Sequence, residues 1–206
     1  ACLNKGEFKL ARIAGLAVVP HAEDVPTLIR AYEVKGYFDE LLDLLESALG
    51  LERAHMGVFT QMGIALAKYR PERLMEYLKL YWSRSNLPQL IKVTDKAHLW
   101  RELVFLYTKY DEPDNAALTI MEHCSDAWDH DQFKAVLPQV ANVEIYYRAL
   151  TFYLEQHPLL LNDLLTVLVK RIDHARVVRM FKKHDHDNVP LIRSYLMSVQ
   201  PQNLEA

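Results

Sequence analysis

The chain has 206 residues, 50% of them hydrophobic, and its 24 Lys and Arg against 27 Asp and Glu leave a formal net charge of −3, which argues against nucleic acid as a partner. The only cysteines, Cys2 and Cys124, lie far apart in sequence, so they indicate neither a disulfide framework nor a Cys-rich zinc site, and a reducing, cytoplasmic setting fits. No apolar run approaches the ~18 residues that span a bilayer, so we expect no insertion into a membrane.

Apolar residues recur at helical spacing along the chain, and turn residues separate the segments. A run of leucines ends with Leu49 just before Gly50, and Met56, Phe59 and Leu66 continue the pattern. We expect Gly50 to close its helix in the left-handed conformation, which costs little for a residue without Cβ. In chain order, the predicted helices are 7–18, 21–35, 37–49, 53–69, 72–84, 87–93, 97–110, 114–124, 131–140, 143–155, 158–170, 173–183 and 190–199.

An aromatic residue precedes a Gly or Pro break at intervals of about 40 residues, the spacing of two-helix repeats. Strand signals are absent. We therefore expect an all-α fold, a right-handed α-α superhelix in which antiparallel helix hairpins stack in a single solenoid run over residues 1–206. The first residues already follow the pattern, as expected for a segment of a longer chain, and the alternative is an ordinary helical bundle with coincidentally spaced aromatics. The aromatic and break positions are Tyr32 with Gly36, Tyr69 with Pro71, Tyr107 with Pro113, and Tyr153 with Pro158.

No catalytic or cofactor-binding motif is present, because the six glycines form neither a dinucleotide fingerprint nor a phosphate loop. We therefore expect no enzymatic activity and no cofactor. Two histidine clusters are candidate metal sites, but the favoured interpretation of both is solvated polar side chains. They are His184 to Asp187, in a predicted loop, and His123 with Cys124 and His130.

Charge is uneven along the chain. Acidic residues outnumber basic ones between 21 and 60, and the balance reverses between 168 and 193. Such a molecule could pair with copies of itself or hold an acidic helix along its basic stretch. The alternative is that these residues form solvated faces. The basic residues of the second stretch are Lys170, Arg171, Arg176, Arg179, Lys182, Lys183 and Arg193.

Several strings resemble the clathrin heavy chain family, in the proximal part of the leg: GLERAHMGVFT at 50–60, AHLWRELVFLY at 97–107, ANVE at 141–144 and LLLNDLL at 159–165. The resemblance implies an α-solenoid strut in a three-legged structural protein whose lattice coats vesicles at the cytosolic face of membranes. It implies other heavy chains and a clathrin light chain as partners. The resemblance also implies a segment that lies outside the adaptor-binding propeller and the trimerisation region of that family. The alternative is a scaffold subunit of another vesicle tethering or vacuolar sorting complex, since such subunits contain related repeats.

The resemblance also implies where a light chain would bind, because its long acidic helix should meet basic positions near hairpin tips. Lys68 is the first candidate, followed by Arg70, Arg73 and Lys109. Before Pro158, where the family usually has Lys, this chain has His157. We expect attraction to an acidic partner at His157 to tighten as the pH falls towards about 6.

Overall fold

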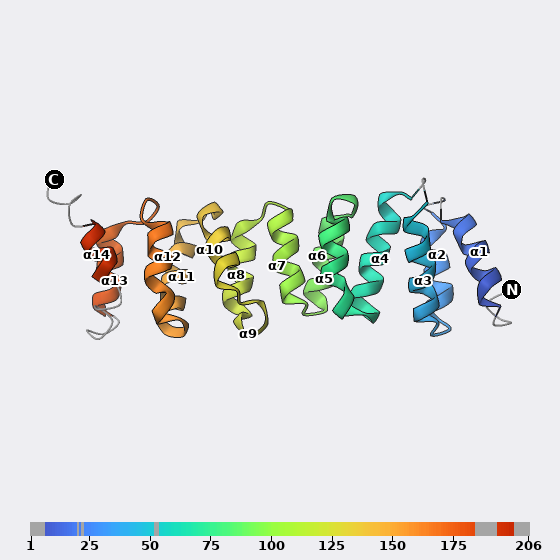
Figure 1. Cartoon of the computed structure of the whole chain (residues 1–206), viewed down its shortest axis with the longest axis horizontal. Helices are drawn as coiled ribbons and strands as arrows, with labels where there is room; N and C mark the ends of the chain where they lie inside the picture. The colour runs from blue at the N-terminus through green and yellow to red at the C-terminus, as the bar shows by residue number, and fades with distance from the viewer. Residues whose placement is uncertain (1–6, 20, 22, 52–53, 184–192, 200–206) are drawn as a thin grey trace. The chain divides into compact units, whose positions relative to one another are not determined.

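The structure is a computed structural model that describes residues 7–19, 21, 23–51, 54–183 and 193–199. These residues form helices joined by turns, with no strand among them (Figure 1). They belong to two compact units, unit 1 at Ala1–Tyr110 and unit 2 at Asp111–Ala206. The predicted fold class, an all-α stack of helix hairpins, is confirmed, whereas one continuous run over residues 1–206 stays a prediction.

In unit 1, consecutive helices pack against each other from α1 to α5 and again at α6 and α7, and α1 also packs on α3, α4 on α6, and α5 on α7. Packing onto the next helix and the next but one is the pattern of stacked hairpins. The elements are α1 (Phe8–Val18), α2 (Val25–Glu33), α3 (Phe38–Leu49), α4 (Met56–Tyr69), the 3-10 turn η2 (Pro71–Arg73), α5 (Leu74–Tyr81), the 3-10 turn η3 (Trp82–Arg84), α6 (Leu87–Lys96) and α7 (Trp100–Lys109).

The core of unit 1 is continuous from Val19 to Leu106, so the hairpins share one apolar interior. Two glycines let its layers approach closely. A Cβ on Gly15 of α1 would lie 2.8 Å from Cδ2 of Leu44 on α3, and a Cβ on Gly63 of α4 would lie 2.8 Å from Cδ2 of Leu90 on α6. A larger residue at either position would therefore have to displace the leucine opposite.

In unit 2, α8 packs against α10 and α11, α11 against α12, and α12 against α14. Its interior is formed by large apolar side chains that are almost fully buried, among them Phe133, Leu150, Tyr153 and Leu165. The elements are α8 (Pro113–Glu122), α9 (Cys124–Ala127), α10 (His130–Val136), the 3-10 turn η4 (Leu137–Gln139), α11 (Val143–Gln156), the 3-10 turn η5 (Pro158–Leu160), α12 (Leu161–Leu168), α13 (His174–Lys183) and α14 (Arg193–Val199).

The glycine of unit 1 with a left-handed conformation is not the predicted one. Helix α3 does end before Gly50, but Gly50 has φ −78° and ψ −6°, so the predicted left-handed cap was wrong. Gly36 takes that role after α2, with φ 72°. The N–H of Gly36 donates to Glu33 O at 3.0 Å and that of Tyr37 to Tyr32 O at 3.2 Å, which satisfies carbonyls at the end of α2.

The predicted helices 72–84 and 131–140 are each divided into a shorter α-helix and at least one 3-10 turn. The segment 72–84 is divided into η2, α5 and η3, with Pro71 opening η2. The segment 131–140 ends its α-helix at Val136, and Pro138 lies within η4, since proline has no N–H to continue α-helical bonding. The predicted helix 190–199 falls within the described residues only from Arg193 onward.

Candidate partner-binding surfaces

Three of the predicted contact residues meet where α4 turns into α5. Helix α4 ends at Tyr69, and Arg70 has the non-helical angles φ −145° and ψ 62° before Pro71 opens η2. The residue before a proline avoids the helical conformation, so this turn follows directly from the sequence. It brings Lys68, Arg70 and Arg73 to one surface, which we call the unit 1 tip.

Each base of the unit 1 tip is paired with a carboxylate of a preceding helix. Arg70 Nη2 lies 2.5 Å from Asp39 Oδ1, Arg73 Nη2 lies 3.2 Å from Glu46 Oε1, and Lys68 Nζ lies 3.3 Å from Glu33 Oε1. The side chains of Lys68, Arg70 and Arg73 remain 49%, 43% and 48% exposed, so a partner can still reach them. The acidic stretch between 21 and 60 therefore supplies their counter-charges.

Among the acids that pair with the unit 1 tip, Glu33 has a second partner, Tyr69. Tyr69 Oη donates a hydrogen bond to Glu33 Oε1 at 2.6 Å, and this bond, with the neighbouring Lys68 charge, lowers the pKa of Glu33 despite partial burial. Burial and the Glu33 carboxylate raise the pKa of Tyr69 to about 12. Phe38 stacks on the Tyr69 ring at 4.3 Å between centroids. Glu33 thus stays ionised and holds Lys68 near physiological pH.

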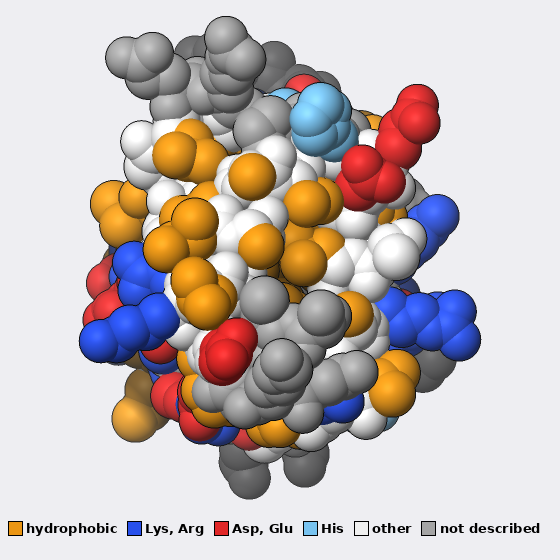
Figure 2. All heavy atoms as spheres, turned by 90° about the vertical axis from the view of Figure 1, so that its right-hand side faces the viewer, with side chains coloured by type: hydrophobic (Ala, Val, Ile, Leu, Met, Phe, Trp, Pro, Cys, Tyr) orange, Lys and Arg blue, Asp and Glu red, His pale blue; other side chains and the backbone are white. Residues whose placement is uncertain are grey.

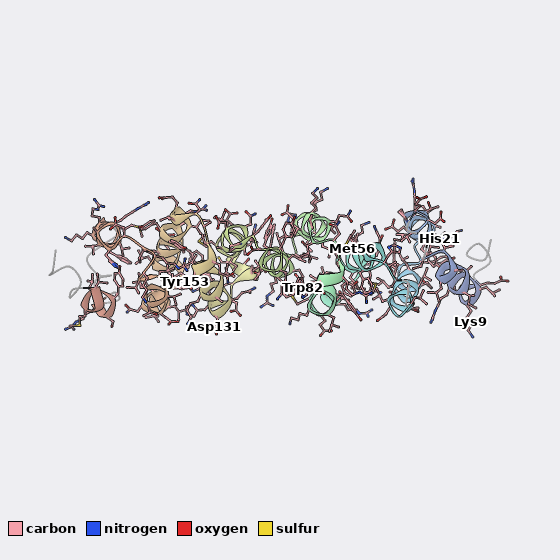
Figure 3. All side chains as sticks on the ribbon, turned by 90° about the horizontal axis from the view of Figure 1, so that it is seen from above. Lys9, His21, Met56, Trp82, Asp131 and Tyr153 are labelled. Carbon is pink, nitrogen blue, oxygen red and sulfur yellow. The ribbon has the colours of Figure 1, made fainter. Side chains whose placement is uncertain are left out.

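Lys109 does not belong to the unit 1 tip. Its Nζ is 5.1 Å from the ring centroid of Trp82 and 5.5 Å from that of Phe105, within the range of cation–π contact. Trp82 follows the end of α5, whereas the unit 1 tip adjoins its start (Figures 1 and 3). Lys109 is therefore near the end of α5 that is opposite to the unit 1 tip, and its role as a light-chain contact stays a prediction.

His157 belongs to an aromatic cluster in unit 2. Its ring stacks on Trp128 with centroids 4.0 Å apart and planes 7° apart, and Phe152 and Tyr153 lie alongside. Burial, with a smaller contribution from His130, lowers the pKa of His157. Any gain of positive charge at His157 thus requires a lower pH than for a free histidine.

The His123, Cys124 and His130 candidate does not form a metal site. His130 uses both ring nitrogens, with Nδ1 2.9 Å from Tyr153 Oη and Nε2 2.8 Å from Asp163 Oδ2. Across the described part of the chain, no group of three or more His, Cys, Asp or Glu side chains could hold a metal ion. The other candidate, His184 to Asp187, lies outside the described residues.

Unit 1 also exposes an apolar face on α1. The side chains of Leu10 and Ile13 are 53% and 66% exposed, and Figure 2 looks onto this end, where hydrophobic side chains gather. A helix that is apolar on opposite sides is usually covered on both. Every helix in the described residues is nonetheless too short or too polar to cross a lipid bilayer.

Comparison with known proteins identifies the repeat. The family model for the clathrin repeat, described as a region in clathrin and VPS, matches residues 16–161. Over all 206 residues the chain is 52% identical to the probable clathrin heavy chain 1 of Caenorhabditis elegans and 52% identical to the probable clathrin heavy chain of Schizosaccharomyces pombe. It is 51% identical over the same length to the clathrin heavy chain of Drosophila melanogaster.

The chain spans 12% of the length of each of these relatives. The match covers both units, and it agrees with the stacked hairpins and with the resemblance noted in the sequence strings. The chain therefore belongs to the clathrin heavy-chain family.

Proposed function

We propose that this chain is a structural segment of a clathrin leg, a stiff strut that contributes to a coat lattice on vesicles at the cytosolic face of membranes. The observation that carries the proposal is the identity of about half the residues with clathrin heavy chains over the full 206 residues. A strut needs a continuous interior and no reaction chemistry, and the uninterrupted core of unit 1 fits that requirement. We accordingly propose that the chain is not an enzyme.

The partners that follow from this function are other clathrin heavy chains and a clathrin light chain. For the light chain we retain Lys68, Arg70, Arg73, Lys109 and His157 as predicted contacts. The partly exposed bases of the unit 1 tip support this choice, while their internal carboxylates limit the attraction that they can offer.

Binding of a purified clathrin light chain to this segment tests the proposal. We expect the unmodified segment to bind and Lys68→Glu to bind more weakly, because the new carboxylate would face Glu33 and repel an acidic partner. Lys92→Glu is the matched control, since Lys92 is an exposed base on another helix, α6.

Failure of the unmodified segment to bind would contradict the light-chain assignment. It would favour the second candidate, a scaffold subunit of a vacuolar sorting or tethering complex, which the family description keeps open because it includes VPS proteins. Retained binding by Lys68→Glu would remove Lys68 from the set of contacts.

A further inference from the structure

Helix α13 of unit 2 has a sharply divided surface. Val177 and Phe181 are 0% and 2% exposed, so this side of the helix packs into the core. Arg176, Arg179 and Lys182 follow one another at intervals of three residues, which directs them to the opposite side. Lys170 and Arg171 are exposed in the turn before α13. We call Lys170, Arg171, Arg179 and Lys182 the α13 basic face.

Arg176 already forms an ion pair with Glu144 of unit 2. Its two terminal nitrogens donate to the two carboxylate oxygens of Glu144 at 2.7 and 2.6 Å, and its guanidinium lies 3.7 Å from the ring centroid of Tyr147. Such a bidentate, stacked arginine fixes α13 on α11. We therefore exclude Arg176 from the α13 basic face.

The four bases of the α13 basic face form no ion pair with any residue that the structure describes. Two acids of the described segments that precede α13, Asp173 and Asp163, have other partners. Asp173 Oδ1 accepts the backbone N–H groups of Ala175 and Arg176 at 2.8 and 3.2 Å, at the start of α13. Asp163 binds Lys134 at 2.6 Å and His130 at 2.8 Å. The positive charge of the face is thus not neutralised within described unit 2.

The α13 basic face differs in this respect from the unit 1 tip. At the tip, an acidic partner must compete with an internal carboxylate at every base. Exposed charges that have no counter-charge produce the potential that attracts and orients an oppositely charged partner. The α13 basic face therefore offers more electrostatic attraction than the unit 1 tip.

We propose that the α13 basic face docks an acidic helix and supplies more of the electrostatic binding energy than the unit 1 tip. The inference rests on the proposed function, because the acidic light chain is the partner that such a face would fit. A membrane fits less well, since membrane-surface helices expose large apolar side chains beside their bases, whereas Val177 and Phe181 of α13 are buried in unit 2. Nucleic acid fits poorly with a net charge of −3.

Two matched double variants test the proposal. Arg179→Gln with Lys182→Gln removes two positive charges three residues apart from the α13 basic face, and Arg70→Gln with Arg73→Gln removes two at the same spacing from the unit 1 tip. The probes are a clathrin light chain and a synthetic glutamate-rich helical peptide. Affinities are measured at low and at physiological salt, and circular dichroism checks that each variant is folded.

We expect the α13 double variant to weaken binding of both probes about tenfold and to reduce the salt dependence, and the tip variant to weaken binding less than about threefold. An equal or larger loss in the tip variant would overturn the proposal. So would unchanged binding in the α13 variant, or an α13-dependent affinity for anionic vesicles or for a second copy of the chain in place of the probes.

The two probes separate this inference from the proposed function. If the acidic peptide bound through α13 and the light chain did not bind, the result would support the α13 basic face as a docking site for an acidic helix. It would contradict the light chain as the natural partner of that face. Binding of the light chain with no contribution from α13 would support the proposed function and overturn the inference. Binding of neither probe would overturn both.

Discussion

The turn from α4 to α5 in unit 1 and the turn from α11 to α12 in unit 2 share one backbone design. Helices α4 and α11 both have 14 residues, and their caps, Arg70 and His157, have φ, ψ of −145°, 62° and −140°, 53°. In each case a proline opens a 3-10 turn of three residues, and a helix of eight residues follows.

The side chains at these two turns differ in kind. The unit 1 tip is held by ion pairs to α2 and α3, whereas His157 is held by aromatic stacking on Trp128. Both following helices bury leucines completely, Leu74 and Leu78 in α5 and Leu161 and Leu165 in α12. The two turns thus share the proline and the buried leucines. The side chains beside the proline differ between the two turns although the backbone conformation is nearly the same.

The largest effect that this comparison predicts is at Trp128. Replacing it with alanine removes contacts with Phe133, Phe152 and Tyr153 as well as the stack on His157. We expect a loss of about 3 kcal/mol in the free energy of unfolding of unit 2. Urea denaturation with hydrogen exchange measures it, and a loss no greater than that of a surface ion pair would contradict the role of the cluster.

Proline substitutions test whether the backbone design is shared. Pro71→Ala and Pro158→Ala each release a φ angle that is already suitable in the folded turn, so each should destabilise its unit by about 0.5–1 kcal/mol through the unfolded state. Hydrogen exchange reports each unit separately. Effects that differ by more than about 1 kcal/mol would show that the tip side chains contribute to the turn conformation.

Breaking an ion pair of the unit 1 tip should have a smaller effect. A double-mutant cycle with Arg70→Ala and Asp39→Ala should give a coupling of about 0.5 kcal/mol that fades in high salt, because both side chains are largely exposed. The matched cycle with His157→Ala and Trp128→Ala should keep its coupling in salt. Salt-insensitive coupling at Arg70 would imply a contact other than charge.

The smallest predicted effect is the pH dependence at His157. Its pKa is lowered in the folded state, so the unfolded state binds more protons below its ordinary pKa of about 6.5, and stability falls as the pH drops from there through the folded pKa. Asp163 has a lowered pKa too, but its loss of stability lies in a more acidic range. His157→Gln should therefore flatten the stability of unit 2 between about pH 7 and 5. An unchanged slope would exclude His157 as its source.

Much of this fold could be predicted from the sequence because apolar spacing and prolines act locally. The helix ends at Tyr69 and near Pro158 follow from them directly. The conformation of Gly50 could not be predicted, since a helix can end with a glycine in a right-handed turn, and the left-handed position went to Gly36. The aromatic period was also only approximate, because structurally equivalent turns place Tyr69 opposite Gln156, not Tyr153.

The sequence suggests candidate contact residues, but it does not show which other side chains they contact. Lys68, Arg70 and Arg73 appear as a basic group, while their carboxylates come from positions about 30 residues earlier and meet them only after the helices pack. His157 similarly gives no sign in the sequence of its stack on Trp128. The sequence likewise does not show that the bases of the α13 basic face have no ion pair among the described residues, while Asp173 and Asp163 have other partners.

The glycines facing leucines in unit 1 have a consequence for the repeat distance. Where Gly63 meets Leu90, the leucine side chain of α6 packs directly on the backbone of α4, so these two layers lie closer than two facing side chains would allow. Alanine at Gly63 would either force Leu90 into another rotamer or widen that interval. Because hairpins in such arrays contact only their neighbours, widening this one interval would displace every later layer of unit 1 by the same amount. A single methyl group at Gly63 would thus move the later helices of unit 1 relative to the earlier ones while leaving each hairpin intact.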